Sequence, residues 1–354
     1  MNLFKRTWLS IKRNYGKSLV LFGIIFLLSS LMAGAISVNQ AIINTDMALR
    51  SQLPAIATII IDQNAHEEHL DQTGEFLTIE VRPSTIRELG TLPYVQAYDY
   101  SAWGLSFFSI SLERFFDASL FLDIGMPEAD ISDAGSLSHW HETLLEQFTL
   151  KGVQYPGILD INAGLIELVD GRPFTEEEVN TLSYVAVVSQ NFLEVNDLSI
   201  GSILTLEYII YDETAELTFG VPSRDENILI SKTFDLEIVG AFDRELEDIL
   251  DPIDVLHHLE LVNLIYVPNL VIESVVDLYL EVLPEIDPAL YSELSSAEQL
   301  EDILNYDSVL FLLDDPTDLV AFAEAANEIL PRFWVIEDLS NAYEVISNSM
   351  VLMN

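Results

Sequence analysis

The six histidines are the residues of this sequence best suited to metal chemistry, and they fall in three pairs. His139 and His141 are separated by one residue, so a β-strand would place both imidazoles on one face as a candidate metal pair. The pair at 66 and 69 lacks the spacing of the His-Glu-x-x-His zinc helix. The adjacent pair at 257 and 258 would point apart in a strand. Only His139 and His141 are kept as metal candidates, beside the simpler interpretation that they are exposed polar residues.

Other catalytic motifs are absent or incomplete. Gly16-Lys17-Ser18 resembles the end of a phosphate-binding loop, but the required earlier glycine is replaced by Ile11. The segment 160–164 begins like a calcium loop, yet its later ligands are out of register, which favours an ordinary turn. Neither Gly-x-Ser-x-Gly nor Ser-x-x-Lys occurs. We therefore expect no catalytic residue, no cofactor on this chain and no enzymatic activity.

Charge is distributed very unevenly along the sequence. The chain has 354 residues, and its 58 acidic and 15 basic side chains give a net charge of -43. Residues 1–17 hold five basic side chains and no acidic one, which leaves ten basic and 58 acidic side chains, or -48, for the rest. Nucleic-acid binding needs a basic surface, so the acidic bulk excludes it. Half of the residues are hydrophobic, which excludes a disordered acidic tail, and the absence of cysteine excludes a disulfide scaffold.

An uncharged segment follows the basic one. No charged residue occurs from 18 to 45, and its first 21 residues would span about 31 Å as a helix, close to the bilayer core of about 30 Å. With the basic residues before it, the positive-inside rule predicts a transmembrane helix and its continuation at 18–45, with the N-terminus cytoplasmic and the acidic remainder outside. A buried soluble helix is one alternative. A signal peptide cleaved at Ala33-Gly34-Ala35 is another, but the apolar run continues past that site.

The basic segment 1–17 predicts a short amphipathic helix in the inner membrane interface. Apolar residues recur from Phe4 to Tyr15 at spacings of 4, 3 and 4, and basic residues largely occupy the other positions. An unstructured basic segment is the alternative. With membrane lipid as the partner, the candidate interface residues are Trp8, Lys12, Arg13 and Lys17.

Each end of the outer part offers a strand–helix–strand unit, and the two units could pair into one small sheet. The expected segments are strands at 55–62, 95–105, 308–313 and 333–336, and helices at 83–89, 316–330 and 341–353. The middle is richer in strands, at 184–189, 203–211, 233–239 and 263–267, with a helix at 269–283 and an acidic linker at 284–306. We therefore predict an α+β fold, in which a β-rich subdomain (111–305) is inserted into an α/β subdomain (46–110 and 306–350).

Eight aromatic residues between 94 and 116 admit two interpretations. They could line a groove for a lipid or a peptide, or they could fill the core of a sheet. Core packing is the favoured interpretation, and exposure of the side chains decides between the two.

Five segments together carry a family resemblance. They are LFKRTWLSIKRNYGKSLVLFGIIFLLSSLMAGAISVNQAI at 3–42, LVDGRPFTEEEV at 168–179, VAVVSQNFLEVNDLSIGSILTL at 185–206, FDLEIVGAFD at 234–243 and NLIYVP at 263–268. In combination they resemble the FtsX/MacB-type ABC transporter permeases, in particular the Gram-positive Vex-like subset. One departure is Ile200-Gly201-Ser202, where the family often shows Val-Gly-Asp.

The resemblance implies a MacB-like extracytoplasmic core domain after the first membrane helix, a cytoplasmic ABC ATPase as partner, and a second permease copy or paralogue. Family permeases typically carry four membrane helices, and this sequence offers one. We therefore expect the N-terminal portion of a permease in the cell membrane, extracytoplasmic after about residue 40, whose outer domain gates or transmits ATPase-driven motion to export a peptide, lipid or drug-like substrate. The alternatives are a membrane-anchored extracellular binding or adaptor module, and a secreted soluble domain after signal cleavage. Three further apolar spans downstream of Asn354 would distinguish the permease from the adaptor.

Overall fold

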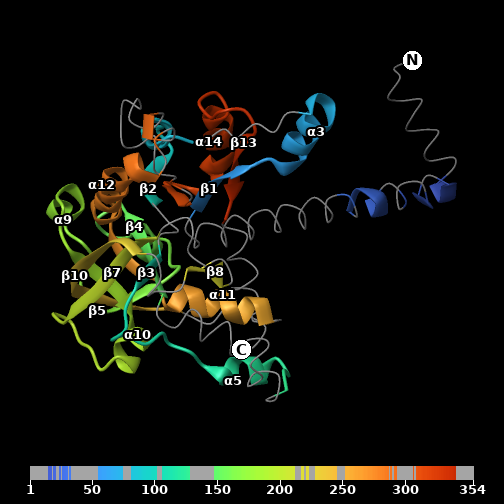
Figure 1. Cartoon of the computed structure of the whole chain (residues 1–354). Helices are drawn as coiled ribbons and strands as arrows, with labels where there is room; N and C mark the ends of the chain where they lie inside the picture. Colours follow the sequence, from blue (N-terminus) through green and yellow to red (C-terminus); the bar gives the residue numbers. More distant parts are fainter. Residues whose placement is uncertain are drawn as a thin grey trace. The chain divides into compact units, whose positions relative to one another are not determined.

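Four strands from the two ends of the segment 55–339 pair into one antiparallel sheet, hereafter the small sheet, in the computed structural model of the chain (Figure 1). Its order is β13-β1-β12-β2, where the strands are β1 (Ala55–Ile61), β2 (Val95–Ser101), β12 (Ser308–Leu313) and β13 (Trp334–Asp338). Each terminal unit contributes two mutually parallel strands with a strand of the other unit between them. This interleaving of two split β-α-β units is the ferredoxin-like arrangement. The expected pairing of the two ends is confirmed.

The structure describes residues 55–74, 81–101, 106–127, 147–211, 217–218, 221–222, 228–244, 252–286, 306 and 308–339, with scattered positions between 15 and 32 and between 288 and 292. The chain divides into two compact units, Met1–Leu53 and Pro54–Asn354. In the first unit the described positions from Tyr15 to Met32 are helical. Among the described residues, no helix has the length and apolar character needed to cross a bilayer.

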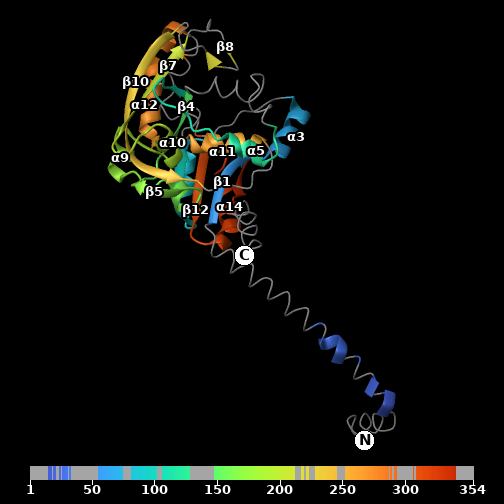
Figure 2. The same ribbon diagram turned by 90° about the horizontal axis from the view of Figure 1, so that it is seen from below.

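A larger sheet is inserted between β2 and β12 (Figures 1 and 2). Its order is β5-β10-β6-β11-β4-β3-β7, and β10 pairs with β7 as well as with β6, so the sheet closes on itself. We call it the closed sheet. Its strands are β3 (Ser106–Phe108), β4 (Gln147–Val153), β5 (Glu167–Gly171), β6 (Val185–Ser189), β7 (Ile203–Tyr211), β10 (Ile228–Asp243) and β11 (Ile265–Pro268). The short strands β8 (Leu217–Thr218) and β9 (Val221–Pro222) pair only with each other among the described strands.

Alternation along the strands places apolar side chains on both faces of the small sheet. On one face, Ala57 and Phe311 pack in a core cluster that also holds Ile86 of α4 (Pro83–Gly90) and Phe322 of α14 (Leu319–Ala326). On the other face, Leu310 packs with residues of α8 (Leu159–Asn162), which follows β4. The small sheet is therefore buried between its own helices and the inserted part of the chain.

The remaining helices cover the inserted part or border it. They are α5 (Ala118–Asp123), α9 (Glu176–Asn180), α10 (Gln190–Val195), α11 (Pro252–Val262) and α12 (Asn269–Ile286), with the 3-10 turn η2 (Pro316–Asp318) before α14. Val271, Ile272 and Val275 of α12 pack into the large core beside the closed sheet. The strand predictions at 203–211 and 308–313 match the observed strands.

The clearest differences between the sequence expectations and the structure concern two helices. The helix expected at 316–330 begins as η2, and α14 ends at Ala326, because residues 328 and 329 donate their N–H groups three residues back to Ala325 and Ala326. The helix α3 (Gln63–Thr73) was not expected, since Ala65 and Leu70 are its only apolar residues and form no helical stripe. Both ends of α3 are capped. At the N-terminus the Asp62 side chain accepts from the Ala65 N–H, and at the C-terminus Gly74 adopts φ +71°. The helix expected at 341–353 lies outside the described residues.

Candidate functional site at the junction of the two sheets

A buried carboxylate joins the small sheet to the closed sheet. Asp99 lies on β2 and is only 5% exposed. One of its oxygens, Oδ1, accepts three backbone N–H groups, from Tyr100 at 2.9 Å, Gln154 at 2.7 Å and Tyr155 at 3.0 Å. Gln154 and Tyr155 directly follow β4 of the closed sheet. A strand of one sheet therefore holds the end of a strand of the other.

Burial disfavours the charged form of this carboxylate. Desolvation is the largest cause, and it raises the pKa of Asp99 to about 7, although the N–H groups of Gln154 and Tyr155 act in the opposite direction. The negative charge of Asp160 raises this pKa further, and the positive charge of Lys151 lowers it. Asp99 therefore changes its protonation state near neutral pH.

A second bridge runs through Asn269 at the start of α12. Its side chain is fully buried, and Nδ2 donates to the backbone oxygen of Tyr100 on β2 at 2.8 Å. Its Oδ1 lies against Gly152 on β4, where a Cβ would come within 2.2 Å of it. Because residue 152 has no side chain, the Asn269 amide can lie against β4 while it donates its hydrogen bond to β2. Strand β4 contributes to both bridges.

A buried ion pair lies beside these bridges. Lys151 of β4 approaches Asp160 of α8, with 2.6 Å between Nζ and Oδ2. The Tyr266 hydroxyl on β11 donates to the same oxygen at 2.6 Å, and the Lys151 Nζ lies 5.4 Å from the Tyr266 ring centroid. Burial, followed by the negative charge of Asp160, holds the pKa of Tyr266 well above its usual range, so its proton stays in place. Two donors therefore converge on one oxygen of Asp160, and the cluster links β4, α8 and β11 beside the junction.

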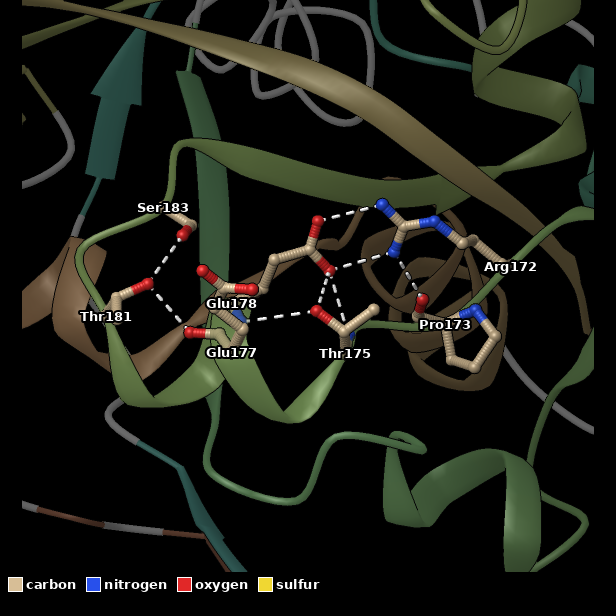
Figure 3. A network of polar contacts seen from close by, with 7 residues as sticks. All are labelled: Arg172, Pro173, Thr175, Glu177, Glu178, Thr181 and Ser183. Atoms are coloured by element: carbon tan, nitrogen blue, oxygen red, sulfur yellow. Dashed lines mark hydrogen bonds and ion pairs between the residues drawn. The ribbon is translucent and has the colours of Figure 1, made fainter.

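The segment LVDGRPFTEEEV at 168–179 forms a polar network at the edge of the closed sheet (Figure 3). The Arg172 guanidinium donates to both carboxylate oxygens of Glu178 at 2.8 Å. Glu178 also accepts from the Thr175 N–H at 2.8 Å, and the Thr175 hydroxyl accepts from the Glu178 N–H, which completes a capping box for α9. The hydrogen bond from Arg172 is the main reason that the pKa of Glu178 is lowered to about 2. This motif organises a turn.

Glu178→Gln is expected to lower the free energy of unfolding by about 1 kcal/mol at neutral pH, because it removes the charge from a bidentate pair whose arginine is half exposed. The folded-state pKa is depressed, so this contribution is present above the unfolded pKa of about 4.5 and is lost as the pH falls toward 2. Denaturant unfolding at about pH 7 measures the loss. Glu177→Gln removes the same charge from the same helical turn without touching Arg172, and an equal loss in both variants would contradict the assignment.

The comparisons with known proteins give one curated relative. No protein-family model matches the chain. The relative is the uncharacterized ABC transporter permease YclI of Bacillus subtilis (strain 168), 24% identical over 223 residues, which cover 60% of this chain and 45% of the relative. The chain is similar to an ABC transporter permease. The resemblance found in the sequence is thereby confirmed, and the chain spans less than half the length of that relative.

Two solved structures also align with most of this permease-like chain. The periplasmic region of MacB from Actinobacillus actinomycetemcomitans gives a TM-score of 0.38 at 11% identity, covering 83% of this chain and 93% of that one. The extracellular domain of the noncanonic ABC-type transporter YknZ from Gram-positive bacteria gives 0.36 at 12% identity, covering 80% and 99%.

Most of the site residues proposed from sequence lie outside the described part of the permease-like chain: His139, His141, Trp8, Lys12 and Arg13. Lys17 is described, as an exposed helical residue, and its interfacial role stays a prediction. Within the described residues, no three histidines, aspartates or glutamates gather closely enough to hold a metal ion.

Two minor motifs differ from their sequence interpretation. The segment 160–164, expected as a turn, forms the end of the short helix α8 and a turn at 163–164, and Asp160 pairs with Lys151. The histidines at 257 and 258 lie on α11, a helix, and not on a strand.

The aromatic run between 94 and 116 is mostly core in this permease-like fold. Tyr100, Phe107 and Phe108 are all buried. Phe107 makes an edge-to-face contact with Phe234 of β10, at 5.6 Å between centroids. Core packing is therefore confirmed for these three side chains. Phe115 and Phe116, which are half-buried, line a surface cavity described below.

Proposed function

We propose that the chain is part of an ABC transporter permease subunit of the FtsX/MacB type and performs no chemistry of its own. The similarity to the permease YclI over 223 residues carries this proposal. The segment at 18–45 spans the membrane, the N-terminus is cytoplasmic, and the domain after about residue 40 lies outside. This domain transmits or gates ATPase-driven motion for export.

The junction supports a transmitting role. The chain enters the outer unit at Pro54 and at once becomes β1, which pairs with both β12 and β13 inside the small sheet. A displacement applied at β1 therefore acts on the whole small sheet. Asp99 and Asn269 then tie this sheet to the closed sheet through buried hydrogen bonds, which water does not weaken. The outer unit is built to move as one body.

The proposed partners follow from the permease role. A cytoplasmic ABC ATPase supplies the energy, and a second permease copy or paralogue completes the transporter. Trp8, Lys12, Arg13 and Lys17 contact lipid at the inner face of the membrane, where the basic residues meet anionic headgroups.

Spin-label distances in the complete permease, reconstituted with its ATPase, test this role. These 354 residues contain no cysteine, so label pairs introduced in them occupy defined positions once any cysteine elsewhere in the transporter is replaced. We expect the distance between Ser18→Cys and Ser84→Cys to change when the ATPase is trapped with ATP and vanadate. We expect the distance between Ser84→Cys and Ser199→Cys, both in the outer unit, to stay constant. Asn44→Pro, which breaks the helical continuation, should abolish the first change while phosphate release continues.

The control is Asn180→Pro, a proline at an exposed helix end within the outer unit, which should leave the first distance change intact. If trapping does not alter the Ser18–Ser84 distance in the parent protein, the domain does not receive ATPase-driven motion. If the Ser84–Ser199 distance changes instead, the outer unit works by internal rearrangement and not as one body.

A further inference from the structure

An extended segment, Ser109–Phe116, is held in place by two asparagines that imitate backbone. Asn196, just after α10, accepts from the Glu113 N–H at 2.7 Å and donates to the Glu113 carbonyl at 2.9 Å. Asn263, just after α11, does the same for Phe115, at 2.8 and 2.9 Å. The segment runs from β3 past α10 toward α5 (Figure 1). Its backbone is therefore preorganised although it belongs to no helix or strand.

The one basic side chain of this segment is turned inward. Arg114 is 8% exposed, and its Nη1 donates to the Gln147 carbonyl at 2.8 Å. Its Nη2 lies 2.6 Å from a carboxylate oxygen of Glu260. The guanidinium charge is thus neutralised inside the protein. It does not oppose a cation on the outer side of the segment.

The segment and α10 enclose an open surface cavity of about 670 Å³, a size in the usual range for a ligand site. Its apolar lining includes Ile110, which is 72% exposed, and Val195, which is 39% exposed, with Phe115 and Phe116 beside them. The charged side chains of the lining are Glu113 and Glu194, both exposed, and Arg114, whose charge is paired with Glu260. Apolar side chains left in water beside fixed carboxylates favour a ligand with an aliphatic group flanked by cations.

We propose that this cavity binds a short cationic peptide segment with an aliphatic anchor. The anchor displaces water from Ile110 and Val195, and flanking lysine or arginine side chains pair with Glu113 and Glu194. Anionic lipid headgroups are disfavoured by the same two carboxylates. The proposal goes beyond the transport role and does not depend on it, because binding is measured on the chain without an ATPase.

Fluorescence titration of the full 354-residue chain tests the site. Asn191→Cys places a single label at the cavity, since the sequence has no other cysteine. The probe is a synthetic hexapeptide of alternating lysine and leucine, added to the chain in detergent, with labelled detergent-only samples as blanks. We expect saturable binding that weakens as salt is raised. Ile110→Ser and Glu194→Lys should each weaken binding about tenfold.

The matched controls lie elsewhere on the surface. Ile203→Ser removes an isoleucine that is 54% exposed on β7, and Glu88→Lys reverses an exposed charge on α4, so neither should change binding. Equal binding of a glutamate–leucine hexapeptide would overturn the charge argument. If hexalysine bound as tightly as the lysine–leucine hexapeptide, the proposed role of the aliphatic anchor would be wrong. If the Ile110→Ser variant bound the peptide as tightly as the parent, the peptide would not bind at this cavity. None of these results bears on the spin-label distances that test the transport role.

Discussion

Asp99→Asn is expected to stabilise the unit Pro54–Asn354 at alkaline pH. The asparagine oxygen can still accept the N–H groups of Tyr100, Gln154 and Tyr155, all of which reach Oδ1, while the variant carries no charge to desolvate. The pKa of Asp99 is raised from 3.8 to about 7 by folding. The contribution of Asp99 to the stability of the parent protein is therefore fully present below the unfolded pKa. It is lost as the pH rises through the folded pKa.

The size of the effect follows from the two pKa values. Between about pH 5 and about pH 8 the parent should lose about 2 to 3 kcal/mol of unfolding free energy through Asp99, and Asp99→Asn should not. Urea unfolding of both proteins across this range measures the difference. Asp160→Asn is the contrasting variant, because it leaves the buried Lys151 without its carboxylate and should destabilise instead. A constant offset between Asp99→Asn and the parent at every pH would show that Asp99 does not titrate in this range.

Gly240→Ala is expected to lower the free energy of unfolding by about 3 kcal/mol or more. Gly240 on β10 faces Gly171 on β5 in the strand register, and an added Cβ at 240 would lie 2.3 Å from the Arg172 carbonyl oxygen. Because the obstacle is backbone, relief requires the chain at the end of β5 to move away from β10, which disturbs the hydrogen-bonded pairing of the two strands. Thermal or urea unfolding measures the loss.

Gly171→Ala should be at least as costly, since it adds strain at φ +69° to a Cβ only 2.4 Å from the Val239 carbonyl oxygen. Gly201→Ala separates the two causes. Gly201 also has a positive φ, +88°, but nothing lies within 4 Å of its added Cβ, so only about 1 kcal/mol should be lost. If Gly201→Ala costs as much as Gly240→Ala, close strand approach is not the reason for the glycine pair.

Local patterns were sufficient to predict much of the fold. The β-branched runs at 203–211 and 308–313 are strands because their apolar side chains pack on the core. Their partners were harder to foresee, since the 16-residue β10 pairs with β7, β6 and β5 along its length. Alternation of apolar residues along a strand indicates which face is buried, but it does not identify the neighbouring strand.

The sequence contains only a weak signal for the junction. Asp99 sits in an aromatic-rich strand and Lys151 is the only charge in β4, and an isolated charge in an apolar run is the one available signal. Asp99 accepts from Gln154, and Lys151 donates to Asp160, which also accepts from Tyr266. Folding alone brings these segments together. The asparagine at 269 has no signal, because its function depends on Gly152 lying beside it.

The interleaved small sheet also governs the order of events during biosynthesis. The Thr58 hydroxyl donates to the Val309 carbonyl, a contact between residues separated by 251 positions. At translation rates of about 5 to 20 residues per second, β1 waits about 10 to 50 s for its neighbours β12 and β13. The closed sheet, which ends with β11 at Pro268, can complete its pairing earlier. Until then the apolar strand AIATIII presents two unpaired edges, so residues 55–61 are open to aggregation while the rest of the chain is synthesised.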